Sequence, residues 1–203
     1  PHDEITRQIT LDSLNILDMP PVEQLDRVTR LAAGYFKVTT ALVSLIDENR
    51  QWFLSRFGLD ATETPRNISF CGHTILTEAP LVVGDMRQDD RFADNPLVAG
   101  EPRVRFYAGF PLRLRDGASV GSLCLIDYAP REFSAADLAV LGDLGALAED
   151  EFVCYDLEKI KYGTVIYNGV KSPDFLGKGW QIITLERLFR NFFGESLQMR
   201  WIE

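Results

Sequence analysis

Apolar and polar positions follow several different periodicities within the first 150 residues. Between residues 22 and 36, apolar side chains recur every three or four positions, the spacing of one face of an amphipathic helix. Pro20 and Pro21 suit the first turn of this helix. We expect a shorter helix from Asp12 to Leu17 to precede it, with Asp12 as its N-cap.

Short apolar runs bounded by turn residues predict strands. The predicted strands cover residues 41–46, 51–57, 81–83, 105–114 and 119–126. Asp47-Glu48-Asn49 joins the first two strands into a hairpin. Asp116-Gly117 joins the last two, and this dipeptide is typical of tight hairpin turns. Hairpins require antiparallel neighbours, so the strands should form a central antiparallel sheet.

The segments between the strands differ in character. Thr62 to Asn67 is predicted to be a polar loop, and Cys71 to Leu76 a short helix. Asp89 to Gly100 is rich in Asp, Asn, Pro and Gly and should form an irregular crossing. A last helix should begin after the N-cap Ser134 and run to about Glu158. The predicted fold class is α+β, because these helices must cover the sheet.

Composition and net charge argue against several classes of binding partner. The 203 residues carry a net charge of −9, which argues against nucleic acid and anionic membranes as partners. The longest apolar runs are too short to span a membrane, and the polar start Pro1-His2-Asp3-Glu4 is unlike a secretory signal. Three cysteines and two histidines at these spacings indicate neither a zinc site nor a disulfide scaffold. We therefore expect a cytoplasmic protein without metal or cofactor.

Several sequence blocks together resemble the GAF domains of bacterial signalling proteins. The blocks are LDSLNILDMP (11–20), LDRVTRLAA (25–33), ALVSLIDENRQWFLSR (41–56), ETPRNISFCGHTIL (63–76), DDRFADNPLV (89–98), RFYAGFPL (105–112) and GSLCLID (121–127). The resemblance implies a six-stranded antiparallel sheet flanked by helices, with a small-molecule pocket on one sheet face. It also implies a homodimer formed through the terminal helices, and a downstream signalling protein as a possible partner.

The composition changes near the C-terminal end. Lys37 is the single lysine among the first 150 residues, whereas the last 53 contain four. We assign residues 1–158 to the GAF-like domain and residues 159–203 to a small module with predicted β-β-α-β order. This module is either an appended element or an experimental fusion.

Eight residues are candidates for ligand binding, because they lie where the resemblance places the pocket or its roof. They are Phe70, Cys71, His73, Asp90, Arg91, Asn95, Arg105 and Tyr107. Each has a structural alternative. The Asp and Asn residues of the crossing also suit turns and helix caps, and Tyr107 could pack as core against Trp52 or Phe70. Arg56, Glu63 and Arg66 could form ion pairs or an anion site.

Cys71 is also a candidate catalytic nucleophile, and its sequence context argues against this role. A Cys–His pair can form a reactive thiolate, but Cys71 and His73 stand two residues apart and should not face each other on a helix. Cys71-Gly72 faintly resembles a motif of the free methionine-(R)-sulfoxide reductases, which need a second, resolving thiol. Cys124 lies in an apolar run and is expected in the core. We therefore predict no catalytic residues and no enzyme.

Two functions remain open at the level of sequence. The first is a sensory or regulatory domain that binds a small ligand and transmits the signal through its terminal helices. The second is a dimerisation and protein-interaction scaffold whose pocket is filled by its own side chains and whose aromatic C-terminal segment binds a partner. A pocket without a substantial cavity would favour the second.

Overall fold

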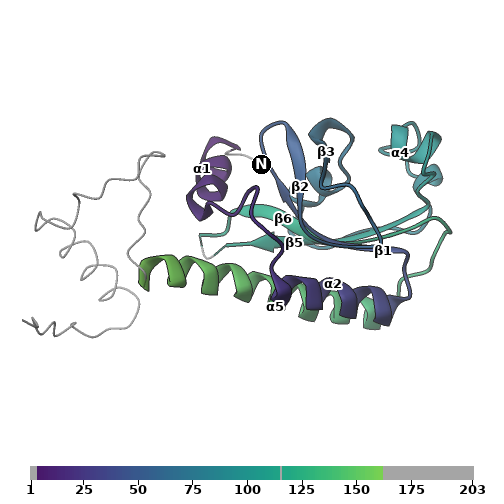
Figure 1. The fold of residues 1–203 in the computed structure, drawn as a ribbon. Helices are drawn as coiled ribbons and strands as arrows, with labels where there is room; N and C mark the ends of the chain where they lie inside the picture. The colour runs from purple at the N-terminus through teal and green to yellow at the C-terminus, as the bar shows by residue number, and fades with distance from the viewer. Residues whose placement is uncertain (1–3, 115, 162–203) are drawn as a thin grey trace, which may run out of the picture. The chain divides into compact units, whose positions relative to one another are not determined.

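The part of the chain that the structure describes contains six strands, which form one antiparallel sheet, as predicted. The structure is a computed structural model that describes residues 4–114 and 116–161. The strands are β1 (Thr40–Ile46), β2 (Arg50–Phe57), β3 (Glu63–Pro65), β4 (Leu81–Val83), β5 (Phe106–Arg113) and β6 (Ser119–Asp127). Their order across the sheet is β3-β2-β1-β6-β5-β4 (Figure 1). Residues 162–203 of the predicted C-terminal module lie outside the described residues, and the module's boundary at residue 158 stays a prediction.

Helices lie on both faces of this sheet. The long ones are α1 (Glu4–Leu14), α2 (Glu23–Phe36) and α5 (Ala135–Lys161). The short ones are α3 (Cys71–Thr74), α4 (Pro96–Ala99) and the 3-10 turns η1 (Arg66–Ile68) and η2 (Met86–Gln88). Figure 1 shows α2 and α5 side by side beneath the sheet, with α4 on the opposite side. The fold class is therefore the predicted α+β arrangement.

Two hydrophobic cores follow from this layering. On one face, Leu11, Val28 and Leu141 from the three long helices pack with strand residues. On the other face, Phe92 and Tyr107 belong to a second core beneath α3. Strand β1 is buried along its whole length because it is central in the sheet and contributes to both cores.

The long helix α5 begins as its sequence predicts. Ser134 Oγ accepts a hydrogen bond from the Asp137 amide at 3.2 Å, and the Asp137 carboxylate accepts one from the Ser134 amide at 2.9 Å. This reciprocal pair is a capping box. It fixes the point at which α5 turns back along the sheet.

The N-terminal helix and the edge strand differ from the sequence prediction. Helix α1 begins at Glu4 and contains Asp12 in its last turns, so Asp12 is not its N-cap. The prediction failed because Arg7, which is buried, occupies the inward face where an apolar residue is expected. Strand β3 lies in the predicted polar loop. It is an edge strand of three residues, too short and polar to show an alternating pattern.

Candidate functional site

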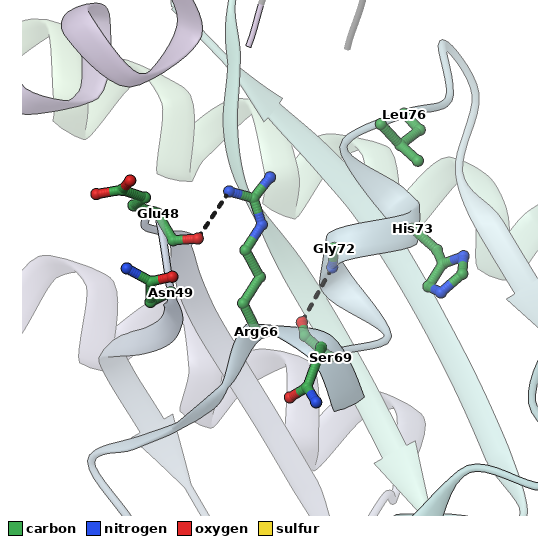
Figure 2. Close-up of a pocket in the computed structure, with 8 residues that line it drawn as sticks. Glu48, Asn49, Arg66, Ser69, Gly72, His73 and Leu76 are labelled. Carbon is green, nitrogen blue, oxygen red and sulfur yellow. Dashed lines mark hydrogen bonds between the residues drawn. The ribbon is translucent and has the colours of Figure 1, made fainter. Parts of the chain in front are cut away.

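A polar cleft of about 480 Å³ opens between three segments of the chain. They are the β1–β2 turn, η1 with the residues around it, and α3 (Figure 2). The lining residues are Glu48, Asn49, Arg66, Asn67, Ser69, Gly72, His73 and Leu76. Pockets for small ligands usually measure about 300–1,000 Å³, so this cleft has the size of a ligand site.

Arg66 is the fixed positive charge of the cleft. Figure 2 shows its side chain extending between Glu48 and the segment that carries Gly72. Its Nη1 donates to the backbone oxygens of Asp47 at 3.1 Å and Glu48 at 3.3 Å. The same nitrogen lies 2.8 Å from a carboxylate oxygen of Glu4 in α1. A guanidinium held in this way is preorganised to bind an anionic or carbonyl group.

The turn beside Arg66 is attached to α1 by further bonds. Arg7 donates from Nη1 to the backbone oxygen of Ile46 at 2.7 Å, and Gln8 donates to Asp47 Oδ1 at 2.8 Å. The Glu4 carboxylate accepts hydrogen bonds from Arg7 and from Arg66. These hydrogen bonds, chiefly those from Arg7, lower the pKa of Glu4 to about 2, although its burial acts in the opposite direction. Glu4 is therefore ionised at neutral pH, and α1 is held against the wall of the cleft.

The opposite wall of the cleft is formed around α3. The Ser69 hydroxyl accepts a hydrogen bond from the Gly72 amide at 3.0 Å and donates one to Gln51 Oε1. The His73 ring packs edge-on against Phe92 with centroids 4.8 Å apart. Burial, followed by the nearby charge of Arg91, lowers the pKa of His73. His73 is thus uncharged at neutral pH and can donate or accept one hydrogen bond.

A second, smaller cavity lies on the sheet face where the sequence analysis expected the ligand pocket. Its volume is about 90 Å³, and side chains such as Leu42, Phe53 and Phe70 line it. A cavity of this size is well below the usual range for ligand pockets. This cavity is therefore too small to be, by itself, the ligand pocket that the resemblance implies.

The structure separates the eight predicted binding residues. His73 lines the polar cleft, and Phe70 and Cys71 line the small sheet cavity. The remaining five line neither: Asp90, Arg91, Asn95, Arg105 and Tyr107.

Two of the three candidates of the crossing segment, Arg91 and Asn95, make local structural contacts. Asn95 caps α4, since its Oδ1 accepts from the Leu97 amide at 2.9 Å and its Nδ2 donates to the Ile68 oxygen at 3.1 Å. Arg91 forms an ion pair with Asp89 at 2.6 Å, and Asp90 is exposed. These contacts match the structural alternative stated for turn and cap residues.

The two candidates of β5 and its approach are also structurally engaged. Arg105 donates two hydrogen bonds to the carboxylate of Asp85, at 2.8 and 2.6 Å. Tyr107 is fully buried and packs on Phe70 with ring centroids 5.5 Å apart. Its hydroxyl lies 2.6 Å from the hydroxyl of Thr74. Tyr107 thus packs as core against Phe70, which was the structural alternative.

The cleft includes six residues that sequence reasoning did not select: Glu48, Asn49, Asn67, Ser69, Gly72 and Leu76. Arg66 was considered, but with other partners. Glu63 pairs with Arg50 at 2.8 Å, and Arg56 is exposed, so neither shares a site with Arg66. The sequence signal that could have pointed to the cleft is the polar turn between β1 and β2. Any surface hairpin has such a turn, so it does not identify a binding site.

The described residues offer neither a metal cluster nor a membrane-spanning helix. Within residues 4–114 and 116–161, no three His, Cys, Asp or Glu side chains lie together in a way that could hold a metal ion. The helices of these ranges include none long and apolar enough to cross a membrane. The predicted cytoplasmic location stays a prediction.

Comparison with known proteins gives both a family and a relative. The family model of the GAF domain matches residues 20–151 of this chain. The cyclic di-GMP phosphodiesterase PA2567 of Pseudomonas aeruginosa is 44% identical over 142 residues, which are 70% of this chain and 24% of that protein. The chain therefore spans about a quarter of the length of this relative.

Solved structures share the fold at low sequence identity. Free methionine-R-sulfoxide reductase from Neisseria meningitidis superimposes with a TM-score of 0.57 at 20% identity, over 75% of this chain and 93% of that one. The GAF domain of an Acinetobacter phosphoenolpyruvate-protein phosphotransferase gives 0.53 at 19% identity, over 77% and 98%. At these identities the comparison shows the fold alone.

The prediction that the protein is not an enzyme is corrected by these comparisons. The relative that shares 44% of the aligned residues is itself named as a phosphodiesterase. The prediction rested on the first 150 residues, which offered no paired catalytic groups by spacing. The chain covers 24% of that relative, so the residues on which the prediction rested are a small part of it.

Proposed function

The chain belongs to the GAF domain family, and on this premise we propose that it senses a small polar ligand in the cleft lined by Arg66 and His73. The single observation that carries the proposal is the cleft itself, at about 480 Å³. It offers a fixed guanidinium, a neutral imidazole and amide side chains to one ligand. The smaller sheet cavity, at about 90 Å³, lacks the room for such a molecule.

Signal transmission follows the bonds that join the cleft to α1. A ligand that binds Arg66 competes with Glu4 for the same guanidinium, and Glu4 belongs to α1. Helix α1 contacts α5, the 27-residue helix that ends the described domain. Occupancy can bias an output only if the ligand binds two arrangements of these helices with different affinity. The ligand would replace Glu4 as the partner of Arg66, and this replacement would give the two helix arrangements different affinities for the ligand.

The relative's name supports a specific output. We infer that the protein carrying this domain degrades cyclic di-GMP, and that the GAF domain adjusts the rate of that reaction. The support is the 44% identity to a protein named as a cyclic di-GMP phosphodiesterase. A domain that covers 24% of such a protein leaves ample chain for a separate catalytic part.

A dimerisation scaffold is the second candidate, favoured by exposed apolar side chains on the paired helices. Leu31 and Tyr35 of α2 are 60% and 56% exposed, and Leu147 of α5 is 54% exposed. Leu31 and Tyr35 stand four residues apart and so share a helical face. A homodimer through α2 and α5 would cover them. The small sheet cavity agrees with this candidate as well.

Native mass spectrometry of the freshly purified chain separates the two candidates. The sensory proposal predicts a mass above the denatured mass, with the excess lost on denaturation. It also predicts that Arg66→Ala removes the excess, because the cleft loses its positive charge. Arg103→Ala is the matched control, since Arg103 is 73% exposed and pairs only locally with Glu101.

Two outcomes oppose the sensory proposal. Bare protein that runs as a dimer supports the scaffold instead. A ligand that remains bound to Arg66→Ala at the level of the control places the site elsewhere in the domain.

A further inference from the structure

Two cysteine thiols meet in the second core, although 53 residues separate them in sequence. Cys71 is the first residue of α3, and Cys124 lies in the central strand β6. Their sulfur atoms are 3.4 Å apart, and both residues are buried, with 1% and 0% exposure. The sequence analysis expected Cys71 to have no thiol partner. The fold supplies one, because α3 packs directly on β6.

The surroundings of Cys71 are polar, which is unusual for a buried cysteine. Gln51 donates from Nε2 to the Cys71 sulfur at 3.1 Å, and the Tyr107 hydroxyl donates at 3.4 Å. The hydroxyls of Ser44 and Ser122, on the adjacent central strands, lie 3.3 Å from each other and complete the cluster. A cysteine that only fills a core has apolar neighbours. This cluster of donors instead favours a negative charge on the sulfur.

The two thiols differ in acidity for this reason. Burial raises the pKa of Cys71, but hydrogen bonds from Cys124, Ser122, Ser44 and Tyr107 outweigh it and lower the pKa to about 6. The hydrogen bond to Cys71, together with burial, raises the pKa of Cys124. Cys71 is therefore the nucleophilic thiolate of the pair, and Cys124 remains a thiol.

A small oxidant would reach Cys71 through the sheet cavity. Cys71 and Gln51 line this cavity of about 90 Å³. Tyr128 lines the same cavity and is 42% exposed, so an oxidant would enter beside Tyr128. Its size excludes large reagents but admits a molecule the size of water or hydrogen peroxide.

We propose that Cys71 and Cys124 are a redox modification site, at which hydrogen peroxide converts the two thiols into a disulfide. The thiolate of Cys71 attacks one peroxide oxygen, the O–O bond breaks, and a sulfenic acid forms while the departing hydroxide takes up a proton as water. The Cys124 sulfur then attacks the Cys71 sulfur. The S–O bond breaks, and hydroxide leaves with the Cys124 proton as a second water. Two thiols are oxidised and one peroxide is reduced.

Formation of the Cys71–Cys124 disulfide requires a small movement of α3, next to the polar cleft. A disulfide is about 2.05 Å long, so the two sulfurs must approach by about 1.4 Å. Cys71 immediately precedes Gly72, and both Gly72 and His73 line the polar cleft. Oxidation would therefore draw α3 toward β6 and alter the cleft wall. The disulfide itself does not depend on whether the cleft binds a ligand.

The test uses the full 203-residue chain, reduced and then transferred to buffer without reductant. Hydrogen peroxide is added and removed, the protein is denatured, the remaining thiols are alkylated in the unfolded chain, and the mass is measured. The chain contains three cysteines, and we expect two of them to escape alkylation with the loss of two hydrogen atoms. Peptide mapping without reduction should find Cys71 joined to Cys124. This pair should be roughly tenfold or more abundant than either pairing with Cys154, since the sulfurs of Cys71 and Cys124 already lie 3.4 Å apart.

Two variants test which cysteine forms the sulfenic acid and which one resolves it. Cys124→Ala should stop at a sulfenic acid on Cys71, which dimedone captures when the protein is unfolded in its presence. Cys154→Ala is the matched control and should form the Cys71–Cys124 disulfide like the unmodified sequence. Thermal unfolding of each variant confirms that it folds, and the mapping of the unmodified chain does not depend on either variant. The proposal is overturned if all three thiols remain alkylatable, or if the disulfides found join Cys154 instead.

Discussion

Replacing Arg7 by methionine should weaken the attachment of α1 to the wall of the cleft. Arg7 is 2% exposed and donates to the Ile46 oxygen at 2.7 Å. It also forms an ion pair with Glu4, whose side chain is 39% exposed. Methionine has a similar length but no donor. The substitution therefore leaves a buried carbonyl without this partner and leaves Glu4 paired with Arg66 but no longer with Arg7.

The magnitude follows from these contacts. A buried hydrogen bond from a charged donor contributes about 1.5–3 kcal/mol, whereas a partly exposed ion pair contributes at most about 1 kcal/mol. Packing of the methionine side chain recovers part of this loss. We expect the free energy of unfolding to fall by about 2 kcal/mol, which lowers the melting temperature by about 4–8 °C for a domain of this size.

Thermal and urea unfolding, followed by tryptophan fluorescence, measure this change. Arg27→Met is the matched control, because Arg27 pairs with Glu23 on the surface, at 65% and 58% exposure. It should change stability by less than about 0.5 kcal/mol. Buried ion pairs can sometimes be replaced by apolar side chains without loss. An Arg7→Met protein as stable as the Arg27→Met protein would show that α1 is held by its apolar face alone.

Two further predictions concern the glycines of α5 and the ion pair between Asp85 and Arg105. An added Cβ at Gly145 of α5 would lie 2.3 Å from the Phe110 ring, whereas one at Gly142 would lie 3.7 Å from it. Gly142→Ala should therefore stabilise the protein by up to about 1 kcal/mol and Gly145→Ala should destabilise it by about 1 kcal/mol, as measured by urea unfolding. Hydrogen bonds from Arg105 lower the pKa of Asp85 to about 2. Because the folded pKa is depressed, the stability that this pair contributes should be present above the unfolded pKa, about 3.9. It should disappear as the pH falls toward 2, so the stability difference between the native protein and Asp85→Asn should shrink over that range.

Much of the fold could be predicted because its signals are local. The hairpin at Asp116-Gly117 depends on a turn that favours positive φ, and Gly117 has a φ of 85°. The start of α5 depends on Ser134 and Asp137, which are three residues apart. In contrast, α1 depends on Arg7, whose buried role is set by the distant Ile46 carbonyl. No local pattern reports such a contact.

The candidate site was less predictable because it forms from segments that meet only in the folded chain. Arg66 and Glu4 are 2.8 Å apart but lie in different elements. Cys71 and Cys124 each have an ordinary local context, and their proximity follows from the packing of α3 on β6. Residues selected for their polarity, such as Asn95, proved to satisfy nearby backbone groups.

Hydrogen–deuterium exchange of the ligand-bearing chain, before and after removal of the ligand, tests the central claim most directly. A sensory cleft predicts that the ligand slows exchange in residues 46–50 and 66–76. It also predicts a change of exchange in α1, since Glu4 and the ligand share Arg66. Protection confined to residues 89–100, or to strands that line the sheet cavity, would contradict the assignment of the cleft as the sensory site.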